Sequence, residues 1–290
     1  MKRVIINADD FGLSEEINLG IIKTHREGIV TNTSIVINGN LVEHGLPLIK
    51  QAPNLGVGIH LNLTYGKPTL PKNECKTLTD QNGRFLGYPK FIQRLILHQV
   101  NLEEVKKELR AQIERFLSYG IECSHIDSHK HIGYLPQVLN IILELAHKFK
   151  ISKMRFPNET AMPTASIYQR GFLKRNTIWR CWISFLAKRS RAKLHKYRIA
   201  YPDYFFGISQ MGHKEKENIF ESILKSCREG ISEIMCHPSL MEEKTSKPGY
   251  GKYGPEHRYR ELRMLIDPRL KEVIKEMNLK LISFDEMSLS

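Results

Sequence analysis

Short apolar runs alternate along this chain with longer segments of helical periodicity, and this alternation constrains the fold most strongly. The runs are β-branched or glycine-bounded and predict strands, at residues 4–7, 33–37, 55–63, 123–126, 152–156, 232–236 and 280–284. The amphipathic segments between them predict helices, at residues 14–27, 41–51, 102–119, 136–149, 216–228 and 269–277. Strands and helices that alternate in this way build a parallel sheet, so the predicted fold class is α/β.

Reactive polar side chains stand near the ends of four predicted strands: Asp9 with Asp10, His60, His125 and His237. Side chains from four strand ends can converge in a barrel, whose active site lies at the C-terminal face, whereas an open sheet would spread them apart. We therefore predict a TIM-like (β/α) barrel, complete or imperfect, as a single domain over residues 1–290. The segments 64–100 and 157–215 are predicted to be insertions that form long loops at that face.

Asp9 and Asp10 are adjacent carboxylates directly after the first predicted strand. Two carboxylates in one pocket repel each other, so the pair needs a proton or a cation. A metal ion on one of them would leave the other as a base. The alternative is a structural role, in which Asp10 or Ser14 caps the following helix.

Histidines are the other candidate ligands. His60 lies in an apolar, glycine-rich run, where a lone histidine is more often a hydrogen-bonded core residue. The run from His125 to His131 places its histidines and Asp127 at alternating positions, on one side of an extended chain. Such donors suit zinc and other transition metals better than magnesium, and Asp127 can instead hold a ligand imidazole through its second ring nitrogen. A polar surface run is the alternative.

His237 precedes Pro238 at the end of a late strand, so the turn aims its imidazole. It is a candidate general acid, with core packing as the alternative. Together these residues predict two imidazoles and one carboxylate around a metal with an open position for water, which indicates metal-assisted hydrolysis. The chain has no GxSxG, Walker or GxGxxG motif after a strand, which disfavours serine-hydrolase, P-loop and dinucleotide-binding functions.

Positive charge is concentrated in one segment. Lysine and arginine number 44 against 31 acidic residues, a net charge of +13. Between Glu159 and Asp203 there is no acidic residue, and the basic residues there are Arg170, Lys174, Arg175, Arg180, Lys188, Arg189, Arg191, Lys193, Lys196 and Arg198. Aromatic and aliphatic residues recur among them at helical spacing, so residues 170–198 predict peripheral contact with an anionic membrane. The alternative is a helix that packs inward and whose charges are solvated.

The cysteine pattern and the N-terminus favour a cytoplasmic protein, with membrane association as a further expectation. The 5 cysteines form no CxxC pair, which disfavours a disulfide framework or a thiolate zinc site. The chain starts without an apolar signal segment and has no apolar run long enough to span a bilayer.

Four motifs resemble the YdjC-like family of carbohydrate deacetylases, which includes the chitooligosaccharide deacetylases: NADDFG (7–12), GIHLNLT (58–64), HIDSHKH (125–131) and MCHP (235–238). The resemblance implies a TIM-like barrel that removes acetyl groups from N-acetylated sugars with a divalent metal, usually Mg²⁺. Residues matching the family's metal ligands are Asp10, His60 and His125, with Asp9 as general base and His237 as general acid. Water deprotonated by Asp9 would attack the acetamide, and His237 would protonate the departing amine.

The run 154–159 and the basic segment after it resemble a longer branch of the family associated with hopanoid biosynthesis. The substrate therefore stays open between chitooligosaccharide-like and lipid-linked glycans. Zn²⁺ or another transition metal stays open beside Mg²⁺, and a homodimer is left open.

Two other functions are alternatives. One is a metal-dependent phosphoesterase or lyase on the same barrel. The other is a basic nucleic-acid-binding protein that contacts phosphate backbones. Because the basic residues cluster in one segment without a known binding motif, no nucleic-acid partner is expected.

Overall fold

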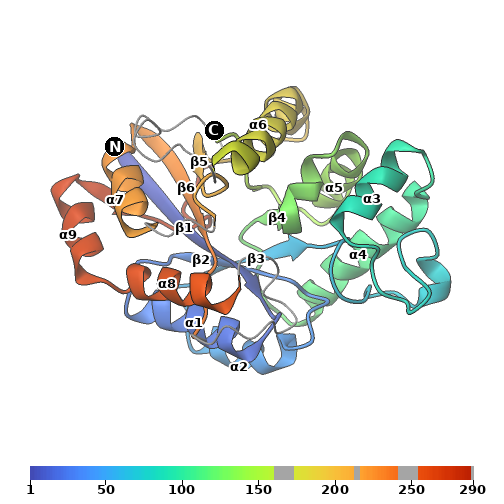
Figure 1. The fold of residues 1–290 in the computed structure, drawn as a ribbon, viewed down its shortest axis with the longest axis horizontal. Helices are drawn as coiled ribbons and strands as arrows, with labels where there is room; N and C mark the ends of the chain where they lie inside the picture. The colour runs from blue at the N-terminus through green and yellow to red at the C-terminus, as the bar shows by residue number, and fades with distance from the viewer. Residues whose placement is uncertain (160–172, 212–215, 241–253, 289–290) are drawn as a thin grey trace.

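A curved sheet of parallel strands runs through the middle of the molecule, with helices around it (Figure 1). The computed structural model describes residues 1–159, 173–211, 216–240 and 254–288. The strands are β1 (Lys2–Phe11), β2 (Asn32–Ile35), β3 (Gly56–Leu61), β4 (Ile126–Ser128), β5 (Tyr204–Phe206), β6 (Gly230–Cys236) and β7 (Leu279–Leu281). Their order is β4-β3-β2-β1-β6-β5, and β7 also pairs with β1.

The described helices include every one predicted from periodicity, the helix expected in the basic segment 170–198, and two that were not predicted. They are α1 (Glu15–Arg26), α2 (Val42–Lys50), α3 (Tyr88–Ile96), α4 (Leu102–Ser118), α5 (Pro136–Lys148), α6 (Leu173–Lys196), α7 (Lys216–Ser226), α8 (Pro255–Leu265) and α9 (Pro268–Glu276), with short 3₁₀ turns η1 (Lys72–Glu74) and η2 (His129–Tyr134). Helices α3 and α6 lie inside the segments predicted to be long loops, and α8 follows the late strand β6.

The α/β class is confirmed, but the sheet curls into a half-barrel rather than a full barrel. Its regular ladder stops at β4 on one side and at β5 on the other. The segment 152–156, predicted as a strand, makes only isolated parallel bridges here, Ile126 with Met154 and Lys153 with Ala200. A third bridge joins Glu159 to Phe205 of β5. The gap between β4 and β5 is therefore spanned by single residue pairs. This arrangement corresponds to the imperfect form of the predicted barrel.

Strand β1 lies at the centre of the sheet and is buried along most of its length. Its register against β2 shifts between Ala8 and Phe11, and Asp10 has a φ of +75° in the left-handed region. An extra residue at such a bulge redirects the side chains around it. Helix α1 then begins behind Ser14, whose hydroxyl accepts a hydrogen bond from the Ile17 backbone N–H.

Within the described residues, no helix is both long and apolar enough to cross a membrane.

Candidate active site

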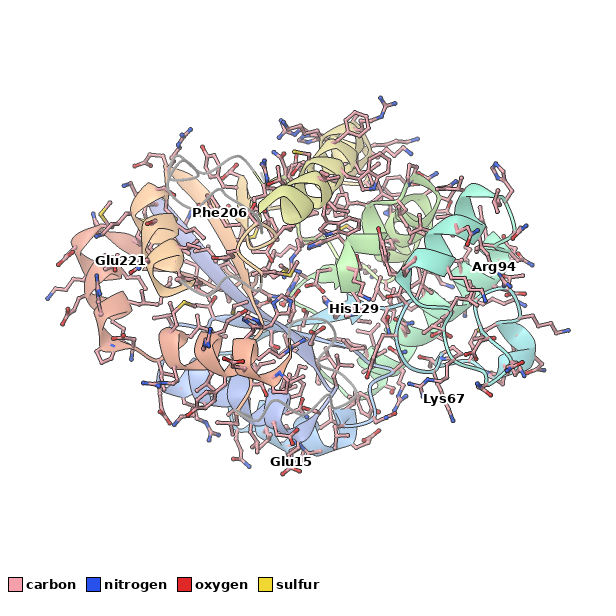
Figure 2. The ribbon with its side chains drawn as sticks, in the orientation of Figure 1. Glu15, Lys67, Arg94, His129, Phe206 and Glu221 are labelled. Atoms are coloured by element: carbon pink, nitrogen blue, oxygen red, sulfur yellow. The ribbon has the colours of Figure 1, made fainter. Side chains whose placement is uncertain are left out.

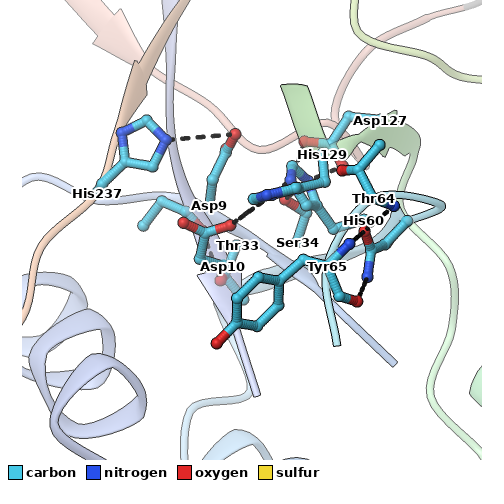
Figure 3. Close-up of polar contacts among 12 residues, drawn as sticks. Asp9, Asp10, Thr33, Ser34, His60, Thr64, Tyr65, Asp127, His129 and His237 are labelled. Carbon is cyan, nitrogen blue, oxygen red and sulfur yellow. Dashed lines mark hydrogen bonds and ion pairs between the residues drawn. The ribbon is translucent and has the colours of Figure 1, made fainter. Parts of the chain in front are cut away.

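Asp10, His60 and His129 lie together where β1 and β3 end and where η2 follows β4. One potential ligand atom from each lies within 4.8 Å of the other two. Asp10 Oδ1 is 3.2 Å from His129 Nδ1 and 3.7 Å from His60 Nε2 (Figure 3). In the wider view, His129 sits near the centre of the molecule (Figure 2). The C-terminal ends of neighbouring parallel strands thus bring one carboxylate and two imidazoles to one point.

Two local backbone features aim these side chains. The bulge and positive φ at Asp10 turn it and Asp9 toward the same region, although neighbours on a regular strand face opposite sides. Behind β4, Lys130 and His131 both have positive φ, at 55° and 54°, so the chain turns sharply just after His129. Left-handed conformations at non-glycine residues cost free energy and concentrate at functional sites.

Asp127 holds the His60 imidazole from behind. Its Oδ1 lies 2.7 Å from His60 Nδ1, and its Oδ2 accepts a hydrogen bond of 2.9 Å from the Ser34 hydroxyl. Burial alone would lower the pKa of His60, but Asp127, Asp9 and Asp10 raise it to about 9. A carboxylate on the far nitrogen of an imidazole is the usual arrangement around metal-binding histidines, because it orients the ring and increases its basicity.

His125 lies outside this group, contrary to its predicted role as a ligand. It faces the interior, stacked on Phe284 with ring centroids 3.9 Å apart, and its Nδ1 lies 2.8 Å from the Ser124 hydroxyl. Gly58 makes room for the ring, since a Cβ there would lie 2.3 Å from His125 Cε1. Burial lowers the pKa of His125 to about 3. His125 is thus a neutral core residue, and His129 occupies the place expected for it.

Asp9 belongs to a buried ionic cluster around Arg155. The guanidinium donates to Asp9 Oδ2 at 2.7 Å and to Asp9 Oδ1 at 2.6 Å. It also lies 3.0 Å from Asp127 Oδ2 and donates to Glu233 Oε1 at 2.6 Å. Burial raises the pKa of Asp9, but Arg155 outweighs it and lowers that pKa below the usual value. Asp9 therefore remains an ionised carboxylate.

Helix α8 contributes two further contacts. Arg258 donates to Asp10 Oδ2, which leaves Asp10 Oδ1 toward the two imidazoles. Burial would raise the pKa of Asp10, but Arg258 and His129 hold it well below its ordinary value. Glu261, one turn further, accepts a 2.6 Å hydrogen bond from the backbone N–H of His237.

His237, the predicted general acid, lies on the side of the site next to Asp9. Its Nε2 lies 4.0 Å from Asp9 Oδ2 (Figure 3). Burial lowers the pKa of the imidazole from its ordinary value, against the opposing effect of the nearby carboxylates. The ring is therefore neutral at neutral pH and lies close enough to exchange a proton with Asp9 through a small displacement.

Among the residues that the structure describes, two groups could hold a metal ion, and one of them fits better. A second group, Asp9, His60 and Asp127, also has ligand atoms within 4.8 Å, but Arg155 already supplies a cation to both of its carboxylates. The first group offers one carboxylate oxygen and two imidazole nitrogens, a donor set that suits divalent metals with open positions.

Sequence reasoning missed Arg155 and Arg258 as members of the site. Arg155 carried a usable signal, because an arginine inside the apolar run Met154–Phe156 must find buried partners. Arg258 stands in a charged segment, and nothing in its neighbours distinguishes it from solvated residues.

Fold and site together define an α/β protein with an aspartate–histidine group at the C-terminal edge of its parallel sheet. The chain belongs to the YdjC-like protein family, whose model matches residues 3–276. It is 34% identical to a protein named carbohydrate deacetylase from Clostridium beijerinckii, over 98% of this chain and 100% of that one. It is 30% identical to a chitooligosaccharide deacetylase from Yersinia enterocolitica, over 98% and 99% of the two chains.

A solved structure from Enterococcus faecalis has a similar fold. It is described as a cellobiose-phosphate cleavage protein and shares 26% sequence identity with this chain. The TM-score is 0.71, with 98% of each chain covered.

Proposed function

We propose that this protein is a metal-dependent hydrolase that removes acetyl groups from N-acetylated sugars. The observation that carries the proposal is the convergence of Asp10, His60 and His129, with Asp9 and His237 beside them. The names of the relatives, carbohydrate deacetylase and chitooligosaccharide deacetylase, support the substrate class.

The proposed metal ligands are Asp10, His60 and His129, the last in place of His125. When bound, a divalent ion would polarise the acetamide carbonyl and lower the pKa of a water molecule. Asp127 orients His60, and Arg258 fixes the second oxygen of Asp10, so both ligands are held before any ion arrives. Two imidazoles and one carboxylate favour a transition metal, whereas the family resemblance implies Mg²⁺.

Asp9 and His237 are proposed to move the protons of the reaction. Asp9 is held ionised by Arg155 and accepts a proton from the attacking water. His237 starts neutral, takes up that proton across the 4.0 Å gap to Asp9, and donates it to the departing amine. The proton lost by water thus reaches the sugar nitrogen, and the products are acetate and a free amino sugar.

Release of acetate from N-acetylglucosamine oligomers tests this proposal. The purified protein should release acetate, lose the activity after chelation, and regain it when one divalent metal is returned. Asp9→Asn should lower kcat by about 100-fold or more, because the amide cannot accept the proton. A matched control is Asp80→Asn, a half-buried carboxylate in the loop after β3, which should keep parental kinetics.

Absence of acetate release from soluble oligomers and from lipid-linked N-acetyl sugars, with each metal supplied, would contradict the proposal. Phosphate release from phosphorylated sugars under the same conditions would assign the site to a phosphoesterase instead.

A further inference from the structure

Helix α6 has two apolar faces, although packing against the rest of the molecule requires only one. The inward face carries the buried side chains Ile183, Leu186, Ala187 and Leu194. Beside this buried face lies a second, exposed set, Ile178, Trp182 and Phe185, with exposed fractions of 73%, 47% and 49%. A surface helix normally turns its polar side to solvent, so this second apolar face requires an explanation.

The exposed residues form one continuous stripe along the helix. Ile178, Trp182 and Phe185 are four and three residues apart, which places them on one side of an α-helix. The rings of Trp182 and Phe185 are roughly parallel, with centroids 6.2 Å apart. The guanidinium of Arg189, one turn further on, lies 5.6 Å from the centre of the Phe185 ring. Aromatic rings and a cation therefore meet at the same surface.

Positive charge surrounds the stripe. Helix α6 has no acidic residue, and its basic residues are Lys174, Arg175, Arg180, Lys188, Arg189, Arg191, Lys193 and Lys196. Lys193 is engaged with Asn140 at 2.7 Å, and Arg191 lies over the Phe156 ring. Lys188, Arg189 and Lys196 are exposed beside the apolar stripe or in line with it.

We propose that the outer face of α6 docks on an anionic membrane surface. Trp182, Phe185 and Ile178 would enter the boundary between headgroups and acyl chains, and the flanking lysine and arginine side chains would contact anionic headgroups. A second copy of this chain is a less favourable partner for the outer face of α6, because two such basic helices would repel each other. A nucleic acid would use the charges and the rings, but not the protruding aliphatic Ile178.

The docking face adjoins the rim of the candidate active site. On the side of α6 next to the stripe, the Trp179 ring meets the Tyr88 ring edge-on, at 5.0 Å between centroids. The Lys130 ammonium lies 6.0 Å from the centre of that same Tyr88 ring and directly follows His129 in the chain. Figure 1 shows α6 on the side of the molecule opposite α1 and α2. Tyr88 thus links α6 to the residue next to His129.

Vesicle flotation tests the proposal with the full chain. The parent should bind phosphatidylcholine vesicles that contain about a third of phosphatidylglycerol, and should bind pure phosphatidylcholine much less. The double variant Trp182→Ser with Phe185→Ser should bind the anionic vesicles roughly tenfold or more weakly. The matched control is Ile96→Ser with Leu97→Ser, which removes two exposed apolar residues at the end of α3 and should bind like the parent.

Tryptophan emission gives a second readout, because the chain has only 2 tryptophans. In Trp179→Phe the emission comes from Trp182 alone and should shift to the blue when anionic vesicles are added. Circular dichroism and thermal unfolding of each variant confirm that the fold is kept.

Equal vesicle binding by the parent and the α6 double variant would overturn the proposal, as would absence of binding to anionic vesicles. It would also be overturned if the double variant abolished binding to a single-stranded RNA but not to vesicles, or only converted a dimer to a monomer in sedimentation. None of these measurements uses acetate release, so they stand apart from the proposed enzymatic function.

Discussion

At the scale of single residues, Arg155 is the least replaceable side chain around the site. It is fully buried, and Asp9, Asp127 and Glu233 share its guanidinium. Three buried carboxylates without their cation would either repel one another or take up protons, and both outcomes cost free energy.

Arg155→Met should therefore lower the free energy of unfolding by about 3–5 kcal/mol, since it removes one partner of a buried ionic cluster. Urea denaturation followed by circular dichroism measures the loss. Arg110→Met is the control, because Arg110 pairs with Glu114 at the surface and should change stability by less than about 1 kcal/mol. A stable Arg155→Met protein would show that the cluster does not support the fold.

His125 and His129 differ in depth, which their spacing in the sequence does not reveal. In β3 and β4, His60 is opposite Asp127 and Ile59 is opposite Ile126. The chain is extended only as far as Ser128, and His129 already belongs to η2, so the predicted alternation does not continue through the run. The register puts His125 a step deeper, beside Gly58. On β4 and the turn after it, the residues from Asp127 onward, opposite His60 or further toward the C-terminal end of the sheet, are the ones placed to reach Asp10.

His129→Ala should lower the affinity for a divalent metal by more than about 100-fold, whereas changes behind the ligands cost about 10- to 100-fold. His125→Ala should leave that affinity within about threefold and instead cost about 1–3 kcal/mol of stability through the lost stacking on Phe284. Isothermal titration with Zn²⁺ or Mn²⁺ and thermal unfolding distinguish the two effects. Loss of metal affinity in His125→Ala alone would restore the original ligand assignment.

At the scale of elements, α4 fixes the chain that leaves β3 toward the insertion. Buried Glu108 accepts hydrogen bonds from the backbone N–H groups of Thr69 and Leu70, at 2.8 and 3.0 Å. Gln112, one turn later, accepts from the N–H of Asn62 at 3.0 Å and donates to its carbonyl at 2.6 Å. Asn62 is two residues beyond His60, so this helix supports the site through backbone contacts.

Glu108→Ala should lower the free energy of unfolding by about 2–3 kcal/mol, because two part-buried N–H groups would lose their charged acceptor. Hydrogen exchange at Thr69 and Leu70 should speed up at the same time, since their amides become accessible. Glu114→Ala on the same helix removes an exposed carboxylate and is the control. Unchanged exchange at both amides would mean that the segment after β3 is held by other contacts.

At the scale of the whole molecule, buried ionisable groups of both kinds make stability depend on pH. Burial raises the pKa of Glu159 and of Glu233 to about 7, from 4.5 for an ordinary glutamate. Each of these two carboxyl groups makes its full contribution to the free energy of unfolding below pH 4.5. This contribution is lost as the pH rises through 7. His125 and His131 act oppositely, since burial lowers their pKa to about 3 and their contribution is lost as the pH falls below 6.5.

These effects oppose each other in the parent. The difference in the free energy of unfolding between the parent and Glu159→Gln therefore isolates the contribution of one carboxyl. As the pH rises from about 4.5 to 7.5, the free energy of unfolding of the variant should increase relative to that of the parent by on the order of 3 kcal/mol. The reason is that only the parent loses stability by ionisation of this carboxyl. Urea denaturation across this range measures the difference. Parallel pH profiles for the two proteins would place the Glu159 titration outside this range.

The single-domain organisation and the cytoplasmic location remain predictions. One cooperative unfolding transition, followed by two probes, would support the first.

The sequence alone determined most of the elements and the kind of donors: parallel strands alternating with helices, and carboxylate and imidazole groups near strand ends. Those features are local, because periodicity and strand ends depend on near neighbours. Tertiary structure alone decided that the barrel stays half closed, that His129 rather than His125 meets Asp10 and His60, and that Arg155 and Arg258 complete the surroundings. Register between strands and contacts across about a hundred residues or more set these outcomes, and no short stretch of sequence contains them.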